Sequence, residues 1–147
     1  MSGPHSVPEL LRTEPPALDL EEAREIASNH YGVSGEFTRL SSERDVNYSI
    51  RTGDGSAFLL KVTNPKEPLA FTDFQIGALQ HLESRAPDLP VPRHVPNLRG
   101  APHASHASGG RVRMLSYLEG QLLYGREISP ELRRSVATTA ARLRSEE

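Results

Sequence analysis

The spacing of apolar residues predicts two helices on either side of a run of strands. Asp19, followed three residues later by Glu22, is a typical helix start, and Gly32 is a typical stop. Apolar residues between them share one helical face, so we expect a helix over 19–31. A second set of apolar residues at helical spacing predicts a helix over 69–84 that packs on a sheet.

Between and after these helices the apolar pattern changes to that of short strands. The expected strands are 37–40, 46–50, 57–62, 95–98 and 111–117. The second and third are joined by Gly-Asp-Gly-Ser, a sequence suited to a tight hairpin turn. Ser129 and Pro130 then open a last helix over about 130–144. This order predicts an α+β fold with a five-stranded antiparallel sheet and a packed helix.

Composition and charge narrow the class of protein. A chain of 147 residues has room for one domain, or for one lobe of a larger one. Residues 1–17 are rich in proline and polar side chains, and we expect a disordered arm there. The 17 basic and 19 acidic residues leave no basic field for nucleic acid or an anionic membrane, so neither is an expected partner.

The residue types also bear on location and metal binding. The absence of cysteine excludes disulfides and thiolate metal sites, and no apolar stretch approaches the length of a membrane span. We therefore expect a soluble cytoplasmic protein. His103 and His106 lie in a loop of small residues without further ligands nearby, so we interpret them as solvated histidines and expect no metal site.

Lys61 is the most informative residue for chemistry. It lies in the apolar strand 57–62, and either it points to water at the strand end or it pairs with phosphate on a rigid strand. The turn between the first two expected strands, residues 41–47, would lie over such phosphates in a kinase-like lobe. It offers backbone amides, hydroxyls and the Arg44 guanidinium. That turn contains no glycine, so it is neither a protein-kinase glycine loop nor a Walker P-loop.

Five segments in order carry a family resemblance. They are SERDVNY at 42–48, LKVTNP at 60–65, DFQ and ALQHL within 73–82, LPVPR at 89–93 and MLSYLEG at 114–120. Together they resemble the aminoglycoside phosphotransferase and choline kinase superfamily, and most of all its hydroxylysine-kinase-like branch. The resemblance implies a protein-kinase-like N-terminal lobe over 18–118, which binds ATP.

The same resemblance implies roles for individual residues. Lys61 would pair with the α- and β-phosphates of ATP. The turn would cover the triphosphate through Ser42, Arg44 and Asn47, and a hinge of Leu115, Ser116, Tyr117 and Leu118 would contact the adenine. Relatives orient the lysine with an acidic residue on the following helix. That position is Gln75 here and the nearest carboxylate is Asp73, about 200° away around the helix, so only one of them can serve.

In this superfamily the catalytic Asp and the metal-binding residues belong to a C-terminal lobe. Residues 119–147 would be the hinge exit and the first helix of that lobe, and after Tyr124 they contain no Asp, Asn or His. We therefore expect no catalytic or metal-binding residue in this chain, and Mg²⁺ only if a C-terminal lobe is supplied, fused or separate.

Two functions remain open, beside a third interpretation as a structural α+β domain, which nucleotide binding would exclude. One is the nucleotide-binding lobe of an ATP-dependent small-molecule phosphotransferase, inactive alone, whose full-length parent phosphorylates a hydroxyl of an amino-alcohol or a hydroxylated amino acid. The other is a short non-catalytic module that binds nucleotide or protein. The sequence leaves open whether the chain is an enzyme, which acceptor it serves and its oligomeric state.

Overall fold

The computed structural model describes residues 13–145 and confirms the α+β class. The described helices are Leu20–Tyr31 (α2), Leu69–Arg85 (α3) and Pro130–Ser145 (α4). The strands are Glu36–Leu40 (β1), Val46–Arg51 (β2), Ala57–Val62 (β3), His94–Val95 (β4), Ala104–Ser105 (β5) and Arg111–Ser116 (β6). Most elements agree with the sequence prediction to within one residue at each end.

The sheet is antiparallel and has six strands, not the five expected from the sequence. Its order is β1-β2-β3-β6-β4, and β5 pairs with β6. The sequence pattern missed β5 because a strand of two residues in a loop of small residues has no measurable period. The expected strand 95–98 is also wrong, since β4 ends at Val95: Pro96 lacks an amide donor and Asn97 Oδ1 caps a turn by accepting the Arg99 and Ala101 amides.

Helix α2 covers one face of the sheet and closes the core. The Asp19 carboxylate accepts the Glu22 amide at 2.9 Å, and Gly32 ends the helix at φ 66°, as the sequence predicts. Buried α2 residues pack on buried side chains of β2, β3 and β6. The Tyr31 hydroxyl donates to the Val112 carbonyl at 3.0 Å, and burial raises the pKa of Tyr31 to about 12.

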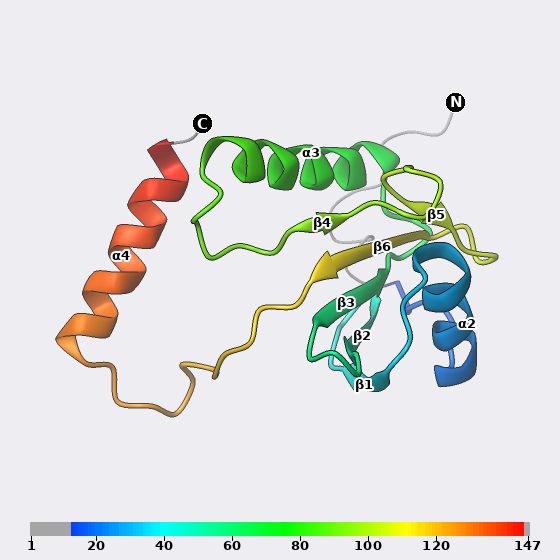
Figure 1. Cartoon of the computed structure of the whole chain (residues 1–147), viewed down its shortest axis with the longest axis horizontal. Coiled ribbons are helices and arrows are strands. Elements are labelled where there is room, and N and C mark those ends of the chain that lie inside the picture. Colours follow the sequence, from blue (N-terminus) through cyan, green and yellow to red (C-terminus); the bar gives the residue numbers. More distant parts are fainter. Residues whose placement is uncertain (1–12, 146–147) are drawn as a thin grey trace.

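Helix α3 lies along the opposite side of the sheet, next to β4 and β6 (Figure 1). It buries only Thr72 and Ile76, while Phe71 and Phe74 are 56% and 73% exposed. The expected packed helix is therefore present, but its packing is sparse. Most of its apolar surface lacks a covering element within the described part of the chain.

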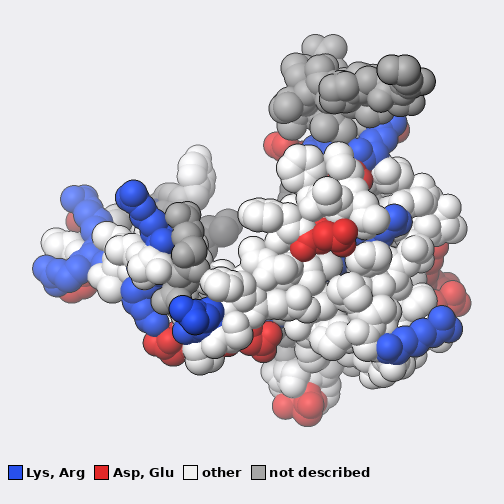
Figure 2. Space-filling model, turned by 90° about the horizontal axis from the view of Figure 1, so that it is seen from above, with Lys and Arg blue, Asp and Glu red and all other residues white. Residues whose placement is uncertain are grey.

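Helix α4 stands apart from the sheet at the end of an extended segment (Figure 1). None of its residues is buried, and Arg142 ties it to the loop after α3 by donating to both carboxylate oxygens of Asp88, at 2.8 and 2.9 Å. Figure 2 shows charged side chains, many of them basic, clustered over α4, whereas the middle of that view is mostly uncharged.

None of the helices in the described residues is long and apolar enough to cross a membrane.

The expected division into 1–17, 18–118 and 119–147 stays a prediction. Residues 1–12 of the expected arm, and 146–147 at the other end, lie outside the described residues. Within the rest of the arm, the Glu14 carbonyl accepts a hydrogen bond from Asn64 Nδ2 at 2.8 Å. Contacts with the sheet therefore begin before Leu18.

Candidate functional site

The strand register places Lys61 in the middle of a row of side chains. Leu40, Asn47, Lys61 and Arg113 are successive Cα partners across β1, β2, β3 and β6. Because neighbouring residues of a strand point to opposite faces, this row lies on the face turned away from α2. We call this surface the Lys61 face.

Lys61 does not point freely into water, because it is held by a carboxylate. Its Nζ lies 2.6 Å from Asp45 Oδ2, and the two side chains are 25% and 12% exposed. The other carboxylate oxygen, Oδ1, accepts the Asn64 amide at 2.9 Å, so Asp45 is fixed at both oxygens. This contact leaves the ammonium group fixed on a rigid strand, partly open to solvent.

Sequence reasoning missed Asp45 as the partner of Lys61. The hairpin could have predicted this partner. The tight turn at 53–56 pairs Asn47 with Lys61, and Asp45 lies two residues before Asn47 on the same face of the sheet. Diagonal neighbours of this kind are within reach of a lysine side chain. The family resemblance indicated a partner on the helix instead.

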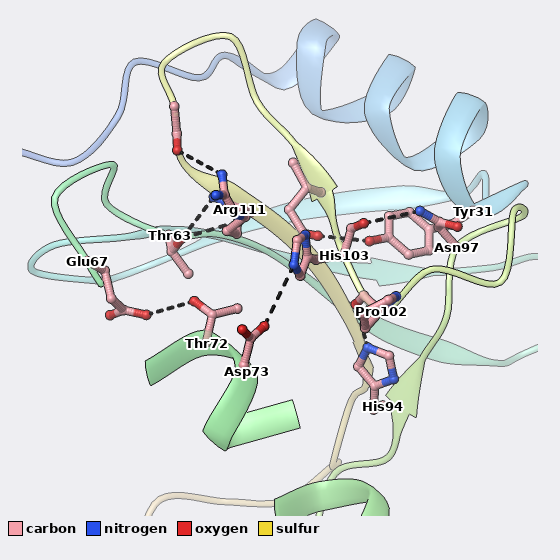
Figure 3. A network of polar contacts seen from close by, with 12 residues as sticks. Tyr31, Thr63, Glu67, Thr72, Asp73, His94, Asn97, Pro102, His103 and Arg111 are labelled. Carbon is pink, nitrogen blue, oxygen red and sulfur yellow. Dashed lines mark hydrogen bonds and ion pairs between the residues drawn. The ribbon is translucent and has the colours of Figure 1, made fainter. Parts of the chain in front are cut away.

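Of the two α3 candidates, Gln75 lies at the Lys61 face and Asp73 does not. Gln75 lines a groove of about 350 Å³ between α3 and the sheet, which we call the α3 groove; Lys61 and Arg113 line it too. Asp73 is directed to His103, whose Nε2 lies 3.8 Å from its carboxylate (Figure 3). Neither α3 residue pairs with Lys61 in the described structure.

The turn residues lie at the other end of the Lys61 row. Ser42 lines a shallow hollow of about 320 Å³, together with Asp45. Arg44 Nε and Asn47 Oδ1 are buried and have no hydrogen-bond partner within the described residues. The Arg44 carbonyl is used, since it accepts a hydrogen bond from Asn64 Nδ2 at 3.2 Å.

The expected hinge is fixed by the sheet. Leu115 is buried, the Ser116 amide donates to the Arg93 carbonyl at 2.8 Å, and the Tyr117 amide donates to the Ala57 carbonyl at 2.9 Å. Leu118 is half exposed, and its amide has no backbone partner among the described residues. Tyr117 also lines a hollow of about 290 Å³ over β1, β2 and β3 on the Lys61 face.

The interpretation of the loop histidines as solvated is wrong for His106. Its ring is 6% exposed, with Nε2 2.9 Å from Glu22 Oε1 and Nδ1 2.7 Å from Ser108 Oγ. It thereby ties α2 to the loop that carries β5, a contact between residues 84 positions apart. The described residues contain no group of three or more His, Cys, Asp or Glu that could hold a metal ion.

The Lys61 face thus combines features of a polyanion site. A fixed ammonium lies at its centre, the buried Nε of Arg113 on the adjacent strand has no partner among the described residues, and hollows extend toward both the turn and the hinge. Fixed cations and unpaired donors on a rigid sheet can hold phosphate oxygens without reorganisation.

Comparison with known proteins agrees with this geometry. Residues 36–146 match the family described as "Phosphotransferase enzyme family". The fold is similar to that of amicoumacin kinase hAmiN in complex with AMP-PNP, Ca²⁺ and Ami, with a TM-score of 0.71 and 16% identity. It is also similar to spectinomycin phosphotransferase APH(9)-Ia in complex with ADP and spectinomycin, with a TM-score of 0.57 and 11% identity.

The extent of these matches shows which part of the fold is present. The alignment covers 88% of this chain but 40% of the amicoumacin kinase, and 78% of this chain but 34% of the spectinomycin enzyme. The chain therefore spans well under half the length of either neighbour, and its fold is that of their kinase-like N-terminal lobe. No curated protein matches the sequence.

Proposed function

Because the chain belongs to the phosphotransferase enzyme family, we propose that it is the nucleotide-binding lobe of an ATP-dependent small-molecule kinase. The observation that supports this most is the position of Lys61, which Asp45 fixes on the sheet face that α3 covers only sparsely. A point charge held on a strand is what pairing with nucleotide phosphates requires. On this proposal residues 18–118 form the nucleotide lobe and 119–147 begin a second lobe.

The polyphosphate chain would lie along the Lys61 row. Lys61 would contact phosphate oxygens, and the turn with Ser42 and Arg44 would close over them. The unpartnered Arg44 Nε supports this, since a buried donor without an acceptor gains a charge-assisted hydrogen bond when an anion arrives. Asp45 would take the orienting role that the resemblance assigned to Gln75 or Asp73, and Asn47 would keep its place beside Lys61 on β2.

The adenine would lie toward the hinge. The Ser116 and Tyr117 amides are used inside the sheet, which leaves the Leu118 amide as the free hinge donor among the described residues. Leu115 and Leu59 face the same side of adjacent strands and would contact the ring. The α3 groove, which Leu59 and Leu115 line, supports this placement.

Phosphoryl transfer itself would need a second lobe, fused to this chain or supplied separately. The described residues contain no group of three or more His, Cys, Asp or Glu that could hold a metal ion, and we derive no catalytic step from them. For the acceptor we propose a hydroxyl of an amino-alcohol or a hydroxylated amino acid. This rests on the sequence resemblance to the hydroxylysine-kinase-like branch. The lack of cysteine fits the cytoplasmic location that we propose.

A second candidate function is a non-catalytic module that binds nucleotide or a protein partner. It is favoured by the segment between β6 and α4, where large apolar side chains are exposed: Leu118, Leu122, Leu123, Tyr124 and Ile128. Exposed apolar patches of this kind are typical of docking surfaces. A stable soluble chain that binds nucleotide and resists complementation by a kinase C-terminal lobe would favour this second function.

Calorimetry with Mg-ATP tests the main proposal directly. We expect the wild-type chain to bind ATP and Lys61→Met to bind it at least about tenfold more weakly, since one charge-assisted contact is lost. Lys66→Met is the matched control, because Lys66 is exposed just beyond β3 and carries the same charge. Equal loss in both variants would show a general charge effect, and no binding by the folded wild-type chain would refute the proposal.

A further inference from the structure

Arg113 is a buried cation beside Lys61 that has no contact assigned to it in the proposed nucleotide site. Its side chain is 2% exposed, and it is the Cα partner of Lys61 on the neighbouring strand β6. It lines the α3 groove together with Lys61 and Gln75. Two cations therefore lie side by side on the Lys61 face, directly opposite each other in an antiparallel pair.

The guanidinium of Arg113 has no counter-ion in contact with it. Its Nε is buried without a hydrogen-bond partner, and no carboxylate of the described residues forms an ion pair with the group. The Asp45 carboxylate forms its ion pair with Lys61 instead. Glu67 acts on Arg113 only at longer range, and its Oε1 accepts a hydrogen bond from Thr72 Oγ1 at 3.3 Å (Figure 3).

This arrangement of two neighbouring cations destabilises the folded chain unless an anion binds to it. A buried charge without a hydrogen-bonded partner is unfavourable, and like charges directly opposite in a sheet repel. Burial lowers the pKa of Arg113, although the carboxylates of Glu67 and Asp45 partly oppose this. Arginine nonetheless stays protonated at neutral pH, so the charge persists.

We propose that Arg113 is a second phosphate-binding cation, which donates to a phosphate oxygen of the nucleotide beside Lys61. The planar guanidinium offers paired donors that match phosphate geometry, whereas Lys61 supplies a point charge. Both side chains line the α3 groove, and the two residues are paired across β3 and β6. This inference rests on the proposed function and assigns a further residue to the same site.

The alternative is a structural role, in which Arg113 only contacts the sheet or awaits a carboxylate of another lobe. The two roles differ in their effect on stability. If phosphate is the partner, replacing the guanidinium with an apolar side chain of similar length removes an uncompensated charge from the ligand-free protein. Arg113→Met should then unfold at the same or a higher temperature without ligand, and lose most of the thermal stabilisation that ATP provides.

The experiment measures binding of ATP, tripolyphosphate and adenosine by calorimetry to the whole chain. The variants are Arg113→Met, Arg113→Lys and Lys61→Met, and the control is Arg99→Met, whose side chain is exposed in a loop. We expect Arg113→Met to weaken ATP and tripolyphosphate binding by about tenfold or more, with adenosine unchanged. Arg113→Lys should restore part of the loss, and Arg99→Met should match the wild type.

Each other outcome has a definite meaning. If the wild type binds ATP, Lys61→Met weakens it and Arg113→Met does not, the inference is overturned while the proposed function stands. A lower unfolding temperature for Arg113→Met with unchanged ATP affinity also overturns it and assigns a structural role. If the wild type binds neither ATP nor tripolyphosphate, both the proposed function and this inference fail.

Discussion

Lys61 Nζ and Asp45 Oδ2 lie 2.6 Å apart across the β2–β3 hairpin. Asp45 precedes β2 and Lys61 is the fifth residue of β3, so the hairpin register alone brings them together. Both side chains are largely shielded from solvent. The contact fixes the one charged side chain of β3 on the Lys61 face.

A double-mutant cycle should show that this pair stabilises the fold. Asp45→Asn retains an oxygen that can accept the Asn64 amide, so with Lys61→Met it isolates the ion pair. We expect a coupling energy of about 1–2 kcal/mol from urea unfolding, because the pair is partly buried. The pair of Arg51 and Glu119 is the control: both side chains are more than half exposed, and its coupling should stay below about 0.5 kcal/mol. Equal coupling in both cycles would contradict the prediction.

The free energy of unfolding should fall at alkaline pH because the buried Tyr31 resists ionisation in the folded chain. Its pKa is raised from 10.0 to about 12 because burial disfavours the phenolate. As the pH rises, the unfolded chain therefore loses the Tyr31 proton before the folded chain does. The stabilisation that results from the protonated Tyr31 is complete below pH 10 and is lost as the pH rises to about 12. The loss should reach about 2–3 kcal/mol, measured by urea unfolding between pH 9 and 12.

Tyr31→Phe is the control for this pH effect. It loses the hydrogen bond to the Val112 carbonyl, so it should be less stable at pH 8, yet its stability should depend less on pH between 10 and 12. An identical alkaline slope in the wild type and the variant would show that other groups are responsible.

Two glycine-to-alanine substitutions should have opposite effects. A Cβ at Gly110 would overlap the Thr63 carbonyl oxygen where the loop meets β3, so Gly110→Ala should destabilise the chain by about 1–3 kcal/mol. Gly77 lies inside α3 with open space around it, so Gly77→Ala should stabilise it by about 0.5–1 kcal/mol. Thermal and urea unfolding measure both, and destabilisation by Gly77→Ala would contradict the open surroundings described for α3.

Helix α4 should be the least protected helix of the described chain. It has no buried residue, and Arg142 with Asp88 ties it to the loop after α3. Amides of α4 should therefore exchange with solvent far faster than those of β3 and β6, and Arg142→Gln should speed them further. Protection of α4 equal to that of the sheet would show that the helix is held by more than this pair.

The same pair should be visible in a titration. The hydrogen bond from Arg142 holds the pKa of Asp88 below its ordinary value, with smaller contributions from other groups. In Arg142→Gln the carboxyl of Asp88 should titrate at higher pH, as followed by NMR of its side-chain carbon. Arg144→Gln, two residues along the same helix, should leave that titration unchanged.

The sequence by itself determined the local elements and indicated the family. Helix α2 starts at its Asp19 cap and ends at Gly32 because capping and apolar spacing depend only on neighbouring residues. Strand β3 has the predicted bounds, and Lys61 lies on it. The ordered motifs predicted the family that the match over residues 36–146 shows.

Tertiary structure decided which side chains meet. Asp45 pairs with Lys61, Asp73 turns to His103, and Arg113 is buried without a counter-ion, because strand register and burial depend on residues far apart in the chain. The contact of His106 with Glu22 spans 84 residues and has no local signal. Strand β5 forms because β6 supplies its partners, and two residues cannot reveal a period on their own.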